Sequence, residues 1–393
     1  MCRAIIVGAG PAGLAAAAAL KRRAGIDAVV VIDRASRVGS SWLARYDVLR
    51  LNTSSWFAYL PGYRHRRGTG VFPSRDRMLE YLEGYAAHHA LDVRLETEVE
   101  RIDREDGGWR VSTSRGELEA EVVVVATGYD RAPFVPAWPG RERFPGTLSH
   151  ASEYRNPEPY RGRDVLVVGP GCSGAEIAHD LAQGGAGRVW LSVRTPPHIV
   201  LRSIGGVPAD LLAVLLYRSP HAVADRLGRF FRRITIGNLT PYGLPTPSDG
   251  LFSRSRRTGM PPATVDRKVI QAIKRRRIEI VPAVEGFDGG EALLAGGARV
   301  APDAVVAATG YRRALEPLVG HLGVLDAAGC PVVSGGPSPP DAPGLHFIGY
   351  NPAVSGPLRH IRLEAGRLAR AVAADSELEA PRVPATAAVT APA

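Results

Sequence analysis

Hydrophobic residues near the N-terminus are grouped in a pattern that predicts one strand–helix–strand unit. Residues 3–7 form a short apolar run rich in β-branched residues, which is typical of a buried parallel strand. A glycine-rich turn follows, and residues 14–23 read as an alanine-rich helix that ends near Gly25. Residues 28–32 give the next strand, which ends at Asp33. The order of strand, turn, helix, strand and acid is that of a βαβ unit.

A second unit with the same pattern begins in the middle of the chain. Residues 164–168 form an apolar strand, a second glycine turn covers residues 169–174, and the helix after it runs to Gln183. The next strand is expected over residues 188–193 and ends at Arg194.

The regions around these units predict further elements. Ser74 is the expected N-cap of a helix over residues 74–90, and two or three strands after it are expected to form a small antiparallel piece: residues 92–95, 99–104 and 109–112. Residues 196–265 break the alternation and predict two helical patches, 209–217 and 221–233. The second patch is amphipathic, so it either lies on a membrane, covers the active site or contacts another subunit. A helix over 264–277 and a strand over 278–281 return to the regular pattern.

An internal repeat links the two units. Residues 121–129 read EVVVVATGY and residues 303–311 read DAVVAATGY, so each unit is expected to end with the same strand and loop. A later buried strand over residues 344–350 can complete the first sheet, and a helix over 358–374 follows it.

The spacing of the glycines in both turns suits the binding of a dinucleotide. The first glycine makes the turn, the second lets the backbone approach a pyrophosphate, and the third lets helix and strand pack closely. The N-terminus of the helix supplies N–H donors and a positive dipole end. The predicted fold class is therefore α/β, with two Rossmann-like dinucleotide-binding domains, the second inserted in the first. We expect the first dinucleotide domain over residues 1–156 plus 300–375, the second over 157–299 with a helical insertion at about 196–265, and a disordered Ala/Pro-rich tail over 376–393.

The residue at the end of the second strand differs between the units. Gly8 plus 25 is Asp33, whereas Gly169 plus 25 is Arg194. A carboxylate suits free ribose hydroxyls, and a guanidinium suits a 2′-phosphate. The second nucleotide is thus expected to be NADP, unless Arg194 is merely a surface residue at a strand end.

Composition and charge narrow the function classes. The net charge of +10 favours anionic partners, but the arginines are scattered and no helix-turn-helix, zinc or RNP-type signature is present, so nucleic acid is not an expected partner. The three cysteines, Cys2, Cys172 and Cys330, form neither a disulfide framework nor a CxxC pair, which indicates the reducing cytoplasm. The longest apolar run, residues 211–216, is too short to span a membrane. No metal site is expected.

Two dinucleotide motifs in one chain favour a flavin that relays electrons and an NADPH that donates them. Between the two turns lies a third motif, Phe144-x-Gly146-x3-His150-x3-Tyr154-Arg155. With both glycine turns, it resembles FxGxxxHxxx(F/Y), the identifying motif of the flavin-containing monooxygenase family. The resemblance covers about residues 1–375 and is closest to the short bacterial and plant-auxin-type members.

The resemblance implies a mechanism. NADPH reduces FAD, the reduced flavin reacts with O2 to give a C4a-hydroperoxyflavin, and this species transfers one oxygen atom to a small-molecule substrate. Tyr154 and the segment after Trp42 depart from the Baeyer–Villiger pattern, so N- or S-oxygenation or oxidation of a 2-oxo acid is favoured. The alternatives are an NADPH-dependent FAD reductase or oxidase and a Baeyer–Villiger monooxygenase, and a homodimer is left open.

The resemblance also assigns residues. The FAD positions are Gly8, Gly10, Pro11, Ala12, Gly13, Asp33, Arg34, Gly39, Ser41, Trp42, Asn52, Val99, Thr127, Gly128 and Gly349. The NADP positions are Gly169, Gly171, Cys172, Ser173, Gly174, Ser192, Arg194, Thr309 and Gly310. Asn52 is the expected catalytic residue, because a neutral amide near the reactive oxygen can donate and accept hydrogen bonds; the alternative is a turn or cap before Ser54. We expect His150 to order the linker and Cys172 to be a filler position of the motif.

Overall fold

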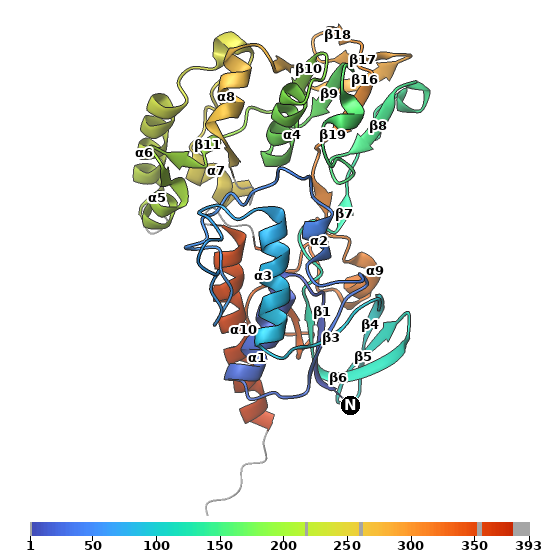
Figure 1. Ribbon diagram of the computed structural model, residues 1–393. Helices are drawn as coiled ribbons and strands as arrows, with labels where there is room; N and C mark the ends of the chain where they lie inside the picture. Colours follow the sequence, from blue (N-terminus) through green and yellow to red (C-terminus); the bar gives the residue numbers. More distant parts are fainter. Residues whose placement is uncertain (1, 217–218, 259–261, 352–355, 380–393) are drawn as a thin grey trace, which may run out of the picture.

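The computed structural model describes residues 2–216, 219–258, 262–351 and 356–379 of the chain. Two sheets organise it, one in the lower and one in the upper part of Figure 1. The lower sheet has seven strands, in the order β3-β2-β1-β6-β5-β4 with β21 also paired to β6: β1 (Cys2–Val7), β2 (Val29–Ile32), β3 (Asp92–Arg94), β4 (Val99–Glu105), β5 (Gly108–Thr113), β6 (Gly116–Val125) and β21 (Leu345–Phe347). The upper sheet has five, in the order β15-β10-β9-β19-β8: β15 (Glu279–Val281), β10 (Val189–Ser192), β9 (Val165–Val168), β19 (Ala304–Ala307) and β8 (Thr147–His150).

The lower sheet is parallel around β1 and antiparallel beyond β6. β1 pairs in parallel with β2 and β6, while β4, β5 and β6 form the antiparallel part. β3 was expected in that antiparallel part but pairs in parallel with β2. β21 pairs in parallel with β6, which confirms that a strand from the end of the chain completes this sheet.

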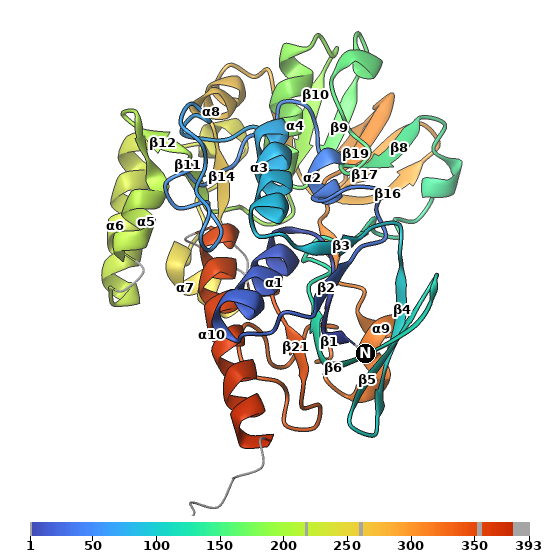
Figure 2. The same ribbon diagram turned by 60° about the horizontal axis from the view of Figure 1, so that its bottom comes forward.

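Helices cover one face of the lower sheet (Figure 2): α1 (Pro11–Arg23), α3 (Arg75–His88) and α10 (Pro357–Glu379). The small side chains of α1 let α10 pack closely, and Ala15–Ala19 are all buried there. Successive β1 side chains point to opposite faces, so Ile6 joins the helix-covered core while Ile5 joins the cluster on the other face. Ser74 caps α3 as predicted, because its side chain accepts a hydrogen bond from the Arg77 N–H.

The upper sheet is all parallel and carries α4 (Cys172–Gln183) and α8 (Arg267–Lys274). α8 starts later than expected, since residues 263–265 form β14 (Ala263–Val265) and pair with β11 (Ile199–Leu201). The remaining elements are short: α2 (Ser40–Leu43), α9 (Glu316–Val319), β7 (Ala132–Pro133) paired with β20 (Tyr311–Arg312), β12 (Ser203–Ile204) paired with β13 (Val207–Pro208), and the sheet of β16 (Val284–Asp288), β17 (Glu291–Leu294) and β18 (Arg299–Val300).

The repeated segments occupy equivalent places, and this corrects the expected domain boundaries. β19 lies beside β9 in the upper sheet as β6 lies beside β1 in the lower one. β8 and β19 therefore belong to the upper sheet, although boundaries at 156/157 and 299/300 assigned them to the first domain. Strands can pair with β9, the strand before the second glycine turn, on both of its sides. The upper sheet therefore includes β8, which precedes the second unit in sequence, and β19, which follows it.

The insertion is helical, as expected, with α5 (Ala209–Leu216), α6 (His221–Thr235) and the unpredicted α7 (Leu251–Thr258) on one side of the molecule (Figures 1 and 2). Residues 376–379 are the end of α10, so the expected tail began too early; residues 380–393 lie outside the described residues. No helix within the described ranges has the length and apolarity needed to cross a bilayer.

Candidate functional site

A cavity of about 990 Å³ runs from the first glycine turn to the helical insertion. At one end its wall contains Gly8, Gly10 and Asp33, and at the other end it contains His198 and Arg232. The start of α4 forms part of the wall between them. The cavity therefore touches the lower sheet, the upper unit and the insertion.

The two glycine turns have the same geometry. A Cβ on Gly8 (φ +115°) would lie 2.5 Å from the Ala126 oxygen, and one on Gly13 would lie 1.9 Å from the Gly8 oxygen. In the second turn, Gly169 (φ +113°) and Gly174 face the same restrictions, with the Cβ of Gly174 1.9 Å from the Gly169 oxygen. Only glycine fits these four positions, as the turn and packing roles require.

The middle glycine of each turn faces open space. A Cβ on Gly10 or Gly171 would meet no atom within 4 Å, and each glycine precedes the first turn of a helix. Backbone N–H groups and a positive helix end are thus accessible at both places, which suits a phosphate.

Backbone hydrogen bonds show that Asp33 and Arg194, each 25 residues after the first glycine of its turn, are not at structurally equivalent positions. The Gly8 N–H donates to the Ile32 oxygen (2.7 Å), and the Gly169 N–H donates to the Ser192 oxygen (3.0 Å). Val193 therefore occupies the place of Asp33, and Arg194 occupies the place of Arg34. The prediction that acid and guanidinium share one position was wrong, because the second unit is one residue shorter between turn and strand end. It remains true that the second unit has no carboxylate there.

Asp33 is held by backbone donors. Its Oδ2 accepts from the Ala9 N–H (2.6 Å) and its Oδ1 from the Ala35 N–H (2.9 Å). The carboxylate thereby joins the glycine turn to the end of β2 while still forming part of the cavity wall.

The structure brings the predicted FAD positions together. Apart from Gly13, which is packed behind the turn, all of them form part of the cavity wall: Gly8, Gly10, Pro11, Ala12, Asp33, Arg34, Gly39, Ser41, Trp42, Asn52, Val99, Thr127, Gly128 and Gly349. Of the predicted NADP positions only Cys172 and Ser173 do so; Gly169, Gly171, Gly174, Ser192, Arg194, Thr309 and Gly310 lie outside this wall. Ser192 is buried, and its hydroxyl donates to the Pro282 oxygen.

At the end of the cavity near the first glycine turn, an arginine without an ion-pair partner among the described residues shows which kind of ligand fits. Arg131 lies in the wall near Gly128, and its Nη1 is buried with no hydrogen-bond partner among the described residues. Burial and the neighbouring Arg34 lower the pKa of this guanidinium. With the open space at Gly10, an anionic group such as the FAD pyrophosphate fits this end.

Asn52 belongs to a buried chain of polar contacts that links the cavity wall to α4. Arg202 donates through Nε to Asn52 Oδ1 (3.1 Å) and through Nη2 to Glu176. The Tyr46 hydroxyl donates to the other oxygen of Glu176 (2.6 Å). Burial raises the pKa of Glu176, and the Arg202 charge opposes that shift. A guanidinium only donates, so the Asn52 oxygen must face it, and the amide N–H groups stay available.

Comparison with known proteins identifies the family. Residues 5–199 match the family model described as pyridine nucleotide-disulphide oxidoreductase. The chain is 38% identical over 321 residues to indole-3-pyruvate monooxygenase YUCCA8 of Oryza sativa subsp. indica, covering 78% of this chain and 75% of the rice protein. It is 36% identical over 321 residues to the probable indole-3-pyruvate monooxygenase YUCCA3 of Arabidopsis thaliana, with 78% and 72% covered. The chain belongs to the flavin-containing monooxygenase family.

Solved structures of such enzymes share the fold. A flavin-containing monooxygenase from Stenotrophomonas maltophilia superposes with a TM-score of 0.75 at 24% identity, over 96% of this chain and 100% of that one. Cyclohexanone monooxygenase from Rhodococcus sp. Phi1, bound to NADP+, gives a TM-score of 0.70 at 20% identity, over 95% and 84%. As a member of the family shown by these relatives, the protein is a flavin-dependent monooxygenase, with FAD and NADPH as its cofactors.

The four fixed residues of the family motif, Phe144, Gly146, His150 and Tyr154, are not part of the cavity wall. Their contacts instead stabilise the structure around it. Phe144 packs on Phe287 (5.1 Å between ring centroids), and a Cβ on Gly146 would lie 2.5 Å from the Phe144 ring and from the Asp303 oxygen. The Tyr154 hydroxyl is buried and donates to Asp180 Oδ2 (2.7 Å).

His150 connects this motif to the repeated Ala-Thr-Gly loop. Its Nδ1 accepts from the Ser152 N–H (3.1 Å), so the proton sits on Nε2, which donates to the Gly310 oxygen (3.0 Å). Burial lowers the pKa of His150, which keeps the ring neutral. These contacts agree with a role in ordering the linker.

Cys172 is a packed thiol. Its Sγ accepts from the Thr264 N–H (3.3 Å), and burial raises its pKa to about 11. The thiol is therefore protonated at neutral pH, although it stands at a helix N-terminus. Within the described residues, no group of three or more His, Cys, Asp or Glu side chains has the arrangement of a metal site.

Sequence reasoning missed Arg202, Glu176, Tyr46, Arg131 and Arg232. Glu176 had a weak signal, an acid beside the buried Ala175 and Ile177 of α4. The arginines had none, because the chain has 49 basic residues and only burial and pairing distinguish these three.

Proposed function

We propose that this monooxygenase transfers one oxygen atom from a C4a-hydroperoxyflavin to a small organic substrate, releasing the second atom of O2 as water with two electrons from NADPH. The observation that carries the proposal is Asn52, an amide in the cavity wall that Arg202 holds by its oxygen. Bound FAD supplies the oxygen-activating chemistry.

The proposed division of the chain follows the two sheets. FAD binds at the first turn, where Gly10 leaves space for the pyrophosphate and Arg131 supplies a positive charge. NADPH binds at the second turn beside Gly171. Val193 replaces the acid that would repel a 2′-phosphate, and the exposed Arg194 follows it without an ion pair to any described residue, which supports NADPH over NADH.

Asn52 is the proposed catalytic residue. Its Nδ2 makes no hydrogen bond with another described residue, so it can donate to the oxygen that is transferred or to the substrate carbonyl. Burial of Arg202 and Glu176, each with a side chain 10% exposed, fixes that orientation.

The favoured substrates are N- or S-nucleophiles and 2-oxo acids. The named relatives act on indole-3-pyruvate, which supports a 2-oxo acid. A disulfide reductase is less well supported, because the pKa of the half-buried Cys172 thiol is raised to about 11 and the thiol is protonated at neutral pH.

The test measures NADPH consumption, oxygenated product and H2O2 with phenylpyruvate, a thioether and a tertiary amine. The wild type should form product in step with NADPH, and Asn52→Leu should divert the electrons to H2O2. Asn238→Leu, at an exposed asparagine outside the cavity wall, is the control and should behave as the wild type. Quantitative H2O2 release by the wild type with every substrate would instead support an oxidase.

A further inference from the structure

The insertion end of the cavity contains a guanidinium with no carboxylate partner. Arg232 of α6 forms part of the wall, and its Nη1 donates to the Thr246 hydroxyl (2.9 Å). Its Nε is buried without a hydrogen-bond partner, and it makes no ion pair with any residue in the described ranges. Burial lowers the pKa of this guanidinium, as expected for a cation that lacks a counter-charge.

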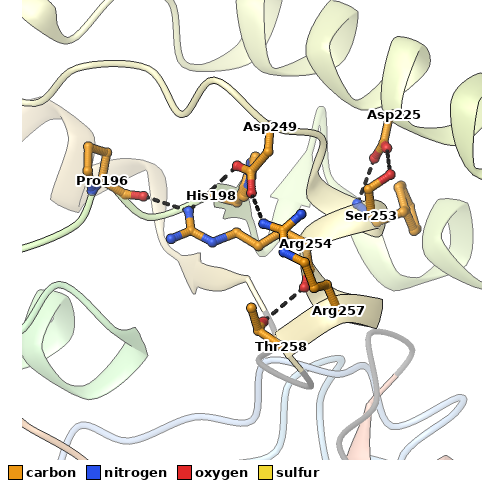
Figure 3. A network of polar contacts seen from close by, with 9 residues as sticks. Pro196, His198, Asp225, Asp249, Ser253, Arg254, Arg257 and Thr258 are labelled. Carbon is orange, nitrogen blue, oxygen red and sulfur yellow. Dashed lines mark hydrogen bonds and ion pairs between the residues drawn. The ribbon is translucent and has the colours of Figure 1, made fainter.

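The two carboxylates labelled in Figure 3, Asp249 and Asp225 of the insertion, are already engaged. Asp249 binds His198 Nε2 (3.1 Å) and Arg257 Nη2 (2.7 Å), with Arg254 at 3.8 Å. Asp225 accepts from the Phe252 N–H (2.7 Å) and from the Ser253 hydroxyl. Neither carboxylate forms an ion pair with Arg232.

Most other charged groups of the cavity wall are paired or face solvent. Asp210 of α5 is the exception: it is buried, its Oδ2 accepts from the Ser54 N–H (2.6 Å) and hydroxyl (2.8 Å), and its Oδ1 has no hydrogen-bond partner among the described residues. Glu98 pairs with Arg34, Asp130 with Arg45, and Glu176 with Arg202. Arg229 is exposed. Two partly buried cations remain, and Arg131 lies at the end where FAD is expected, so the charge at Arg232 still lacks a ligand.

We propose that Arg232 and Thr246 bind the carboxylate of the substrate, which is therefore an organic acid with an apolar body. The apolar wall for that body comes from Ile199, Leu212, Phe231, Leu251 and Phe252. A guanidinium with free donors can hold a carboxylate through paired hydrogen bonds. The inference rests on the proposed function, since it places this acid in the cavity that Asn52 also lines.

A nucleotide phosphate has the same chemistry as the proposed ligand, and the position of the second turn separates the two. Gly169, Gly171 and Arg194 lie outside the wall that contains Arg232, and of the predicted NADP positions only Cys172 and Ser173 reach it. The phosphates of NADPH are thus expected elsewhere, and the substrate carboxylate is the anion assigned to Arg232.

The test compares the equilibrium binding of phenylpyruvate, its methyl ester and NADPH to the oxidised, FAD-loaded enzyme by calorimetry. Arg232→Leu should weaken phenylpyruvate binding roughly 10- to 100-fold, since a hydrogen bond to a charged group is worth about 1.5–3 kcal/mol. It should leave the ester and NADPH unchanged, and Arg232→Lys should restore part of the affinity. Arg233→Leu, at the exposed neighbouring residue, is the matched control and should have no effect.

Equal losses for acid and ester would show that Arg232 only supports the fold, and a loss confined to NADPH would assign it to a nucleotide phosphate; either result overturns the inference. Because binding needs no turnover, the proposed function fails separately. Phenylpyruvate bound through Arg232 but never oxygenated would leave the carboxylate site standing and refute the function.

Discussion

Arg202→Met would leave Glu176 as an unpaired buried carboxylate. Both side chains are only 10% exposed, and Arg202 is the cation that opposes the effect of burial on the pKa of Glu176. Removing one partner of such a pair costs about 3–5 kcal/mol. With an unfolding entropy of about 2.1 cal/mol/K per residue, or about 0.8 kcal/mol/K for 393 residues, Tm should fall by roughly 4–6 °C.

The loss should depend on pH in a definite direction. The pKa of Glu176 in the folded protein is raised above its ordinary value of 4.5, and without Arg202 it should rise further. A raised pKa means that the folded state prefers the protonated acid. The destabilisation should therefore be small below the unfolded pKa and grow as pH rises through the folded one.

The assay is thermal unfolding of the FAD-loaded variants at pH 5 and pH 8. The double variant Arg202→Met/Glu176→Gln also removes the negative charge of Glu176, so it should recover most of the lost stability. Arg77→Met breaks an exposed pair with Glu80 and should cost less than about 1 kcal/mol. If Arg202→Met destabilises no more than Arg77→Met, or equally at both pH values, the reasoning about a buried pair is refuted.

The remaining predictions concern the motifs. Tyr154→Phe should lower stability by about 1–3 kcal/mol, because Asp180 loses a buried donor, while KM for NADPH stays unchanged; a changed KM with normal Tm would contradict the supporting role. Gly174→Ala should prevent soluble expression or NADPH binding, because its Cβ would lie 1.9 Å from the Gly169 oxygen. Gly171→Ala should fold normally and weaken only NADPH binding, because its Cβ would meet no atom within 4 Å. Circular dichroism and NADPH titration distinguish the two variants, and similar behaviour of both would argue against open space for a phosphate at Gly171. Arg194→Ala should reduce the NADPH to NADH ratio of kcat/KM roughly 10- to 100-fold, and an unchanged ratio removes Arg194 from the 2′-phosphate site.

The local pattern of the chain determined the two glycine turns, their strands and helices, the repeat and the family motif. These features depend on short-range rules, such as the need for glycine where a Cβ would strike the Gly8 or Gly169 oxygen. Ser74 as a cap and residues 344–350 as a strand of the first sheet could be predicted for the same reason.

Only the tertiary structure decided how distant segments share a sheet or a site. Strand pairing assigned β8 and β19 to the upper sheet, and backbone hydrogen bonds aligned Val193, not Arg194, with Asp33. The side chains around Asn52 come from α4 and the insertion, so no sequence spacing could join Arg202 and Glu176 to it. The sequence also cannot distinguish Arg232 from other arginines, because a missing counter-charge is a property of burial and neighbours.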